Sequence, residues 1–338
     1  MKGWQVIFIK GGDAELTRAM DVLCGAGVYP EAKGWSTDPV PRPRPQIQVQ
    51  PSNVPQAVAA LSASGIRHVM LGPLGSLVNS EARWTDEYPS WQQYADELEE
   101  VLNWTKAKGQ WNSYLGALQG SNSQRDSALM EIRVAKYLES SGFLVVDWKP
   151  QGAGGNEGEY TVEGQSGQRV FVEVKSPGWE GEVSKEERDA GRLAEPKLKD
   201  LEARAVASWE RIQFAVDKAY KKFRGDTPNF LIIAGDLFIS PQHAPELHAA
   251  QALYSNVPPH PGYFTDQRYD KLGGVGFFWI DSDGAGVQYY MRVFLNPNAL
   301  NETALPLNMR ERFRAEILDP NNLWPDEKPT PLDDGLWA

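Results

Sequence analysis

Cysteine, histidine and long apolar runs are scarce in this chain of 338 residues. Cys24 is the only cysteine, which excludes an internal disulfide bond and a zinc site built from cysteines. The four histidines form no HExxH motif, and their scatter argues against a metal hydrolase with histidine ligands. No apolar run approaches the roughly 18 residues that a membrane helix needs. We therefore expect a cytoplasmic protein with no membrane partner.

Basic residues are also fewer than acidic residues. Lys and Arg together number 34 against 45 Asp and Glu, which gives a formal net charge of −11. This balance argues against a protein that coats nucleic acid or an anionic membrane by bulk electrostatics. The basic residues are unevenly spread, however, because residues 121–235 contain 17 of the 34. A local basic groove in that region is compatible with the acidic total.

The first 71 residues alternate between strand and helix patterns. Short runs of apolar residues predict strands, and apolar residues at helical spacing predict helices between them. Gly11-Gly12 after the first run belongs to neither a Walker loop nor a GxGxxG loop. We therefore expect a small α/β module that selects a substrate or a protein partner and carries no catalytic constellation. The expected strands are Trp4–Lys10, Gln46–Gln50 and His68–Leu71, and the expected helices are Ala14–Ala26 and Val54–Ala63.

Composition divides the chain into four parts. Residues 1–75 form the small α/β module. Residues 76–120 form a linker and a helical connector, which we expect to break near Gly109. Residues 121–310 form the domain that carries chemistry, and residues 311–338 form a C-terminal helix and tail.

Residues 121–235 follow the order helix, strand, strand, strand, helix, strand. The first helix is expected to begin near Ser123 and to end at Gly142. The last strand, Asn229–Ala234, is a continuous apolar run, which is typical of a strand buried on both faces. The other expected elements are the strands Phe143–Trp148, Glu159–Glu163 and Arg169–Lys175, and a long helix from Leu198 to Phe223.

Glu173 and Lys175 end the apolar strand RVFVEVK, and residues two apart on a strand project to the same face. A charged pair in such a place is costly to bury, which favours a functional explanation. Glu159 lies upstream on the neighbouring strand, across a turn that contains glycine. Two carboxylates beside a lysine can bind Mg²⁺ through oxygen. The ammonium group can then orient or deprotonate a water molecule and offset charge on a pentavalent phosphate.

The (Asp/Glu)-x-Lys spacing alone is weak evidence, because it occurs several times in the chain. Asp147 and Lys149, for example, also end an expected strand, but no strand with an acidic residue precedes them. Only Glu173 and Lys175 have both an upstream acid and the surrounding order of elements.

The segment GEYTVEGQSGQRVFVEVKS resembles the core of the PD-(D/E)XK nuclease superfamily. That core has an acid on one strand, a hairpin turn, and (Asp/Glu)-x-Lys on the next strand. The flanking elements are also similar, with SALMEIRVAKYLESSGF before the core and ERIQFAVDKAYKKF and NFLIIAG after it. The resemblance covers roughly residues 121–307. It implies an α/β fold of the restriction-endonuclease-like class, with a mixed central sheet flanked by helices.

The resemblance implies roles for five residues of this chain. Glu159 and Glu173 would be ligands of Mg²⁺ or Mn²⁺, and the backbone carbonyl of Val174 would be a further ligand. Lys175 would position the attacking water. Glu131 would face the site from the preceding helix.

Some alternatives stay open at this point. The family usually has Asp at the first acid, whereas this chain offers Glu159, with Glu157 as an alternative. Glutamate is longer than aspartate, so the metal position would have to shift. Glu173 and Lys175 could instead form an exposed salt bridge, and Glu131 could pair with a buried arginine.

The function that the resemblance implies is metal-dependent hydrolysis of phosphodiester bonds in nucleic acid. DNA is the favoured substrate, and restriction or phage defence is a fitting cellular setting. The alternative is a catalytically degraded module that binds nucleic acid or a protein partner, as an immunity or assembly protein would. An oligomer is compatible with either function. The residues that we expect to contact nucleic acid are Lys218, Lys221, Lys222 and Gln213 on the expected long helix.

Overall fold

The chain folds as two compact units. One contains the described residues up to Ala128, and the other contains most of those from Leu129 onward. None of the described helices is both long and apolar enough to cross a membrane. The computed structural model describes residues 4–9, 13–33, 46–78, 91–120, 122–176, 212–234, 245–256, 261–282 and 286–319.

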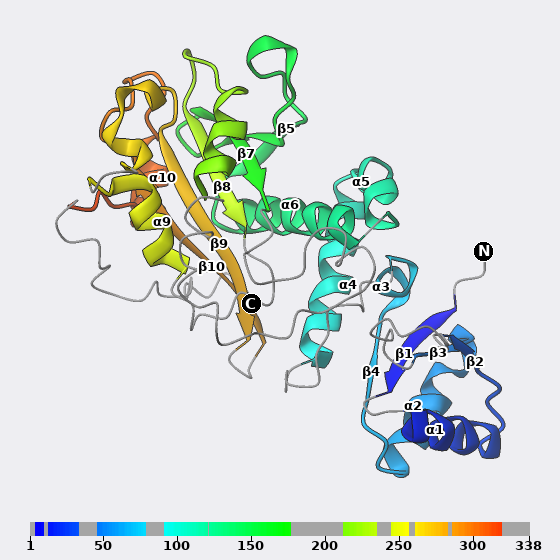
Figure 1. Cartoon of the computed structure of the whole chain (residues 1–338). Coiled ribbons are helices and arrows are strands. Elements are labelled where there is room, and N and C mark those ends of the chain that lie inside the picture. Colours follow the sequence, from blue (N-terminus) through cyan, green and yellow to red (C-terminus); the bar gives the residue numbers. More distant parts are fainter. Residues whose placement is uncertain are drawn as a thin grey trace. The chain divides into compact units, whose positions relative to one another are not determined.

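The first unit is built on a four-stranded antiparallel sheet with two helices in the connections (Figure 1). Its strands are β1 (Gln5–Ile9), β2 (Glu31–Lys33), β3 (Gln46–Val49) and β4 (His68–Met70), and its helices are α1 (Asp13–Gly25) and α2 (Val54–Ala63). The sheet order β2-β3-β1-β4 and the chain order β-α-β-β-α-β make a split βαβ arrangement. The sequence predicted every one of these elements except β2, which is too short to show a period.

Apolar side chains hold this sheet against its helices. Ile7 and Ile9 on β1 and Ile47 on β3 lie in one buried cluster with Leu23 of α1 and Leu61 of α2. Ile7 and Ile9 are two residues apart and therefore project from the same face of the strand. The strands and helices expected over residues 4–71 therefore share one buried core, within a compact unit that extends to Ala128.

Three more helices belong to the first unit: α3 (Pro73–Val78), α4 (Trp91–Ala107) and α5 (Trp111–Leu118). The carboxylate of Glu99 on α4 accepts the N–H groups of Leu74 and Gly75 at 2.9 and 2.8 Å. These bonds satisfy donors in the first turn of α3 that have no partner within the helix. The predicted break near Gly109 is confirmed, because Gly109 has a φ of 73° directly after α4.

The second unit is built on a six-stranded mixed sheet. Its strands are β5 (Leu144–Trp148), β6 (Tyr160–Glu163), β7 (Arg169–Lys175), β8 (Asn229–Ala234), β9 (Gly274–Ser282) and β10 (Val287–Leu295). Its order is β10-β9-β8-β7-β6-β5, with β7, β8 and β9 parallel and β5, β6 and β7 antiparallel (Figure 1). The flanking helices are α6 (Asn122–Ser140), α9 (Pro245–Tyr254), α10 (Leu307–Arg312) and the helical residues 212–220. The predicted α/β class with a mixed sheet flanked by helices is confirmed at this level.

Strands β7 and β8 lie in the middle of this sheet and match their predicted bounds. Every residue of β8 is buried, as its continuous apolar run predicted. On β7, alternation places Phe171 on the same face as Glu173 and Lys175. Phe171 packs against Phe223, which follows the helical residues 212–220, with ring centroids 6.1 Å apart. The charged end of β7 therefore projects toward the end of that helix.

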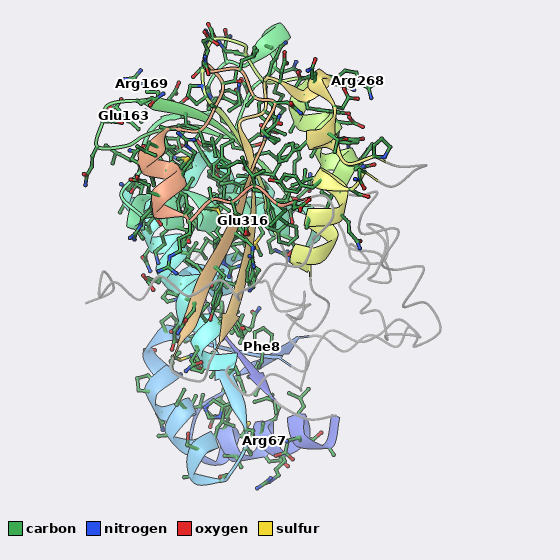
Figure 2. The ribbon with its side chains drawn as sticks, turned by 90° about the vertical axis from the view of Figure 1, so that its left-hand side faces the viewer. Phe8, Arg67, Glu163, Arg169, Arg268 and Glu316 are labelled. Atoms are coloured by element: carbon green, nitrogen blue, oxygen red, sulfur yellow. The ribbon has the colours of Figure 1, made fainter. Side chains whose placement is uncertain are left out.

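The β6–β7 hairpin carries an exposed cross-strand pair at its turn. Glu163 and Arg169 are register partners, and Nε of Arg169 lies 2.9 Å from Oε2 of Glu163 (Figure 2). Two expectations need adjustment. Strand β6 begins at Tyr160, so Glu159 precedes the strand rather than lying on it. The predicted helix from Leu198 is described only from residue 212, and residues 198–211 lie outside the described residues.

Candidate functional site

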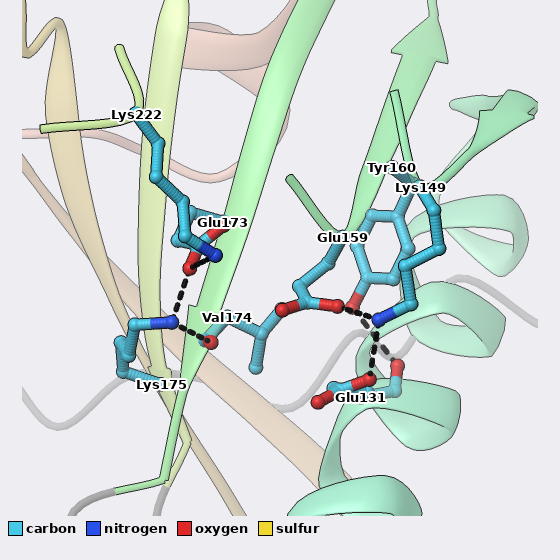
Figure 3. Close-up of polar contacts among 8 residues, drawn as sticks. All are labelled: Glu131, Lys149, Glu159, Tyr160, Glu173, Val174, Lys175 and Lys222. Carbon is cyan, nitrogen blue, oxygen red and sulfur yellow. Dashed lines mark hydrogen bonds and ion pairs between the residues drawn. The ribbon is translucent and has the colours of Figure 1, made fainter. Parts of the chain in front are cut away.

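Glu173 is a fully buried carboxylate near the end of a central strand. Its exposed fraction is 0%. Its Oε1 contacts the ammonium group of Lys175 and lies 2.6 Å from that of Lys222, whereas its Oε2 is buried without a hydrogen-bond partner (Figure 3). We call Glu173, Lys175 and Lys222 the Glu173 cluster. The alternative of an exposed salt bridge between Glu173 and Lys175 is wrong, because the carboxylate has no solvent access.

Lys222 reaches Glu173 from the turn that follows the helical residues 212–220. Its backbone is fixed by the glycine-rich turn after β5, because the N–H of Ala153 donates to the carbonyl of Lys222 at 2.8 Å. Gly152 lies so close to this carbonyl that a Cβ there would be 2.5 Å from the oxygen. The turn therefore requires glycine at this position in order to hold Lys222.

A second group of charges lies on the other side of β7 from the Glu173 cluster, around Lys149 (Figure 3). Nζ of Lys149 lies 3.2 Å from Oε2 of Glu131 and also contacts Oε2 of Glu159. We call Glu131, Lys149 and Glu159 the Lys149 cluster. Glu131 was expected, as one alternative, to pair with a buried arginine. Its ion-pair partner is instead Lys149.

The backbone of Lys149 is in an unusual conformation. Its φ is 56°, which lies in the left-handed region that residues other than glycine rarely adopt. Its N–H donates to the carbonyl of Glu159 at 3.0 Å, and the N–H of Gly158 donates to the carbonyl of Pro150 at 2.9 Å. These two bonds close the glycine-rich turn at its base. They hold Lys149 where its side chain meets both carboxylates.

The pKa values of Glu131 and Lys149 are both raised in the Lys149 cluster. Burial and the negative charge of Glu159 raise the pKa of Glu131 from 4.5 to about 7, and the ammonium group of Lys149 only partly opposes this shift. Burial would lower the pKa of Lys149, but the charges of Glu131 and Glu159 outweigh it and raise that pKa. Glu131 therefore titrates near neutral pH.

Glu159 is positioned by the sheet although it precedes β6. Its N–H donates to the carbonyl of Val172 at 3.1 Å, and the residue is only 7% exposed. Glu157, by contrast, is exposed, and its backbone forms an isolated bridge with Gln151. The hydroxyl of Tyr160 donates to the carbonyl of Glu131 at 2.9 Å and thereby ties β6 to α6. Burial and backbone contacts therefore favour Glu159 over Glu157 as the first acid of the motif.

Within the described part of the chain, no three His, Cys, Asp or Glu side chains are grouped so that they could hold a metal ion. A divalent ion would therefore rest on fewer side chains, and Mg²⁺ is commonly bound by one or two carboxylates together with waters. The candidate ligands are oxygen atoms, which are the ligands that Mg²⁺ prefers. Oε2 of Glu173 is buried and has no partner, whereas Glu159 contacts Lys149 and the carbonyl of Val174 accepts from the ammonium group of Lys175 at 3.4 Å (Figure 3).

The four residues expected to contact nucleic acid have different surroundings. Lys218 and Lys221 are exposed, and Nζ of Lys218 lies 4.3 Å from the ring centroid of the exposed Phe214. Lys222 instead belongs to the Glu173 cluster. Gln213 is half-buried, and its side-chain amide donates to two backbone carbonyls at 3.4 Å. Lys222 is therefore part of the site, whereas the side chain of Gln213 forms hydrogen bonds within the fold.

Lys149 and Gly152 were not singled out as site residues by the sequence. For Lys149 a signal was present, because Asp147-Trp-Lys149 is a second acid-x-lysine match at the end of a strand. The contact with Glu131 and Glu159 involves residues distant in sequence, which no local pattern contains. For Gly152 the only signal was the glycine-rich turn.

The candidate site thus consists of two clusters, which together contain three carboxylates and three ammonium groups. They come from α6, the turn between β5 and β6, β7 and the turn after the helical residues 212–220. Comparison with known proteins gives no relative: no protein-family model, no curated protein and no solved structure matches this chain.

Proposed function

We propose that this chain is a divalent-metal-dependent nuclease that hydrolyses phosphodiester bonds of nucleic acid, with DNA as the favoured substrate. The order helix, strand, strand, strand, helix, strand and the mixed sheet support a restriction-endonuclease-like fold for the second unit. The identity of the motif residues supports the PD-(D/E)XK type of nuclease. Restriction or phage defence is the cellular setting that suits this activity.

One observation carries the proposal. Glu173 is completely buried, yet one of its oxygens has no hydrogen-bond partner. Leaving a buried carboxylate oxygen unsatisfied costs free energy, so such an atom in a native fold calls for a functional explanation. A hard cation that is bound through oxygen would satisfy it.

The residues of the chain have distinct parts in the proposed reaction. Mg²⁺ or Mn²⁺ on Glu159, Glu173 and the Val174 carbonyl would supply Lewis acidity and lower the pKa of a bound water. Lys175 is held by Oε1 of Glu173 and directs its ammonium group at the attacking water and the charge on the phosphate. Glu131 acts through Lys149 and keeps the carboxylate of Glu159 in place.

The nucleic-acid backbone would bind along the helical residues 212–220 and the turn after them. Lys218 and Lys221 are exposed there, and Lys222 lies at the Glu173 cluster. Lysines that approach a phosphate backbone from one helix position it without reading its sequence. This local charge suits a protein whose total charge is −11.

A second function is favoured by a different feature, the balance of charge in the site. Three lysines already face the three glutamates, so above about pH 7, where Glu131 is ionised, the site is electrically neutral without a metal ion. This neutrality favours a module that binds nucleic acid or a protein partner and performs no hydrolysis.

The experiment that separates the two functions uses the purified full chain with Mg²⁺ or Mn²⁺ and single- and double-stranded DNA and RNA. We expect cleavage of at least one substrate by the native chain and none by K175A. The matched control is R169A on the same strand, because Arg169 is 67% exposed and pairs only at the surface. Survival of all substrates with both metals contradicts the nuclease. Binding that K175A leaves intact and K218A/K221A weakens would then favour the binding module.

A further inference from the structure

Lys149 is a positively charged residue that has no role in the (Asp/Glu)-x-Lys motif of Glu173 and Lys175. We propose that its ammonium group is a built-in counter-ion for Glu131 and Glu159, and that it restricts the site to one divalent ion where two would otherwise bind. This inference rests on the proposed metal-dependent function. It adds the number of ions that the site holds and the residue that sets this number.

The contacts of Lys149 are those of a bound cation. Its Nζ lies 3.2 Å from Oε2 of Glu131 and contacts Oε2 of Glu159 at the same time. A divalent ion shared by two carboxylates would be held by oxygens of the same two groups. The ammonium group and such an ion therefore exclude each other, both by space and by repulsion between like charges.

The backbone holds the lysine in this position. A φ of 56° is unfavourable for a residue with a side chain, and the surrounding structure must over-determine it. The bonds at the base of the glycine-rich turn do so, since the N–H of Lys149 donates to Glu159 and the N–H of Gly158 donates to Pro150. Lys149 is thus fixed at both its backbone and its ammonium group, and strain of this kind is characteristic of functional positions.

The carboxylate of Glu173 is different. Its Oε2 is buried and has no partner, although its Oε1 faces two ammonium groups. Figure 3 shows one oxygen of Glu159 turned toward Lys149 and the other toward Val174. The unpartnered oxygen of Glu173 would take the one ion, while the position between Glu159 and Glu131 is filled by the lysine.

The test is the number of Mn²⁺ ions bound per chain at pH 8, measured by titration calorimetry and by the electron paramagnetic resonance signal of free Mn²⁺. We expect one ion for the native chain and two for K149M, whose side chain has similar length without the charge. K149R keeps the positive charge and should bind one. K149M/E131Q removes one of the two carboxylates and should return to one.

Each outcome bears on the inference. Two ions on the native chain overturn it without any variant, which keeps it testable even if K149M does not fold. A single ion on folded K149M overturns it as well, and cleavage by the native chain would then leave the proposed nuclease standing. No Mn²⁺ on any variant contradicts both the inference and the metal-dependent function.

Discussion

The ammonium group of Lys222 lies 2.6 Å from Oε1 of Glu173, so a residue in the turn after a helix compensates the charge of one on a central strand. A carboxylate with no solvent access requires such partners, because an unpaired buried charge is strongly destabilising. Of the two lysines that pair with Glu173, Lys175 lies on the same strand. Lys222 lies on a separate element that tertiary packing brings to the strand.

Replacing Lys222 by Met should lower the free energy of unfolding by about 1–3 kcal/mol, because the buried carboxylate then keeps only Lys175. Urea denaturation followed by circular dichroism measures this. The matched control is K221M, since Lys221 is the adjacent lysine and is exposed. Its change should stay within about 0.5 kcal/mol. Equal losses in the two variants would show that Lys222 stabilises the fold no more than a surface lysine does.

Gly152→Ala should destabilise the second unit by about 1–3 kcal/mol through overpacking. The new Cβ would lie 2.5 Å from the carbonyl oxygen of Lys222, which is backbone and cannot move aside freely. G225A is the control, because a Cβ at Gly225 meets no atom within 4 Å. Thermal unfolding of both variants checks the prediction. A melting temperature for G152A as high as that of G225A would mean that the turn accommodates the new Cβ without a loss of stability.

Stability should depend on pH through Glu131. The folded chain holds its proton up to about pH 7, whereas the unfolded chain loses it near pH 4.5. Between these values the folded state binds more protons, so the free energy of unfolding should fall as pH rises from about 5 to 8, by up to about 3 kcal/mol. E131Q cannot lose a proton and should flatten this decline. Urea denaturation at pH 5.5 and 8 tests it, and an unchanged slope in E131Q would assign the effect to other groups.

Adding Mg²⁺ or Mn²⁺ should raise the melting temperature of the native chain, because a ligand that binds only the folded state stabilises it. At a concentration of about 100 times the Kd, the gain is about 2.7 kcal/mol. E173Q should lose this shift, since it replaces the buried carboxylate with an amide of the same size. The exposed-site variant R169A should keep it. A metal-induced shift that survives in E173Q would locate the ion elsewhere on the chain.

The elements around the site follow from local patterns in the sequence. Strands β7 and β8 have the predicted bounds because alternation in one and a continuous apolar run in the other are strong signals. The elements of residues 4–71 were anticipated for the same reason, with the exception of β2, which spans only Glu31–Lys33. Helix α3 lies in a segment that the sequence indicated to be a linker. Local patterns thus suffice for these elements, whereas α9, β9 and β10 lie outside the segments whose elements were predicted.

The partners of the site residues could not be predicted in this way. Glu173 and Lys175 are neighbours on a strand, so their contact follows from the period of two. Lys222 meets Glu173, and Lys149 meets Glu131, only because separate elements are packed together. The positive φ of Lys149 is likewise imposed by the closed turn and not by its own preference. Tertiary packing decides such contacts, and a single sequence carries little record of it.

The glycine-rich turn between β5 and β6 has a consequence for how this protein evolves. Lys149 stands at its base, and Ala153 within it holds the backbone of Lys222. An insertion or deletion in the turn would therefore displace two lysines that the sequence places far apart. Among homologues, the length of this turn should change together with the residue types at positions 149 and 222. Homologues that keep the turn length should keep both lysines.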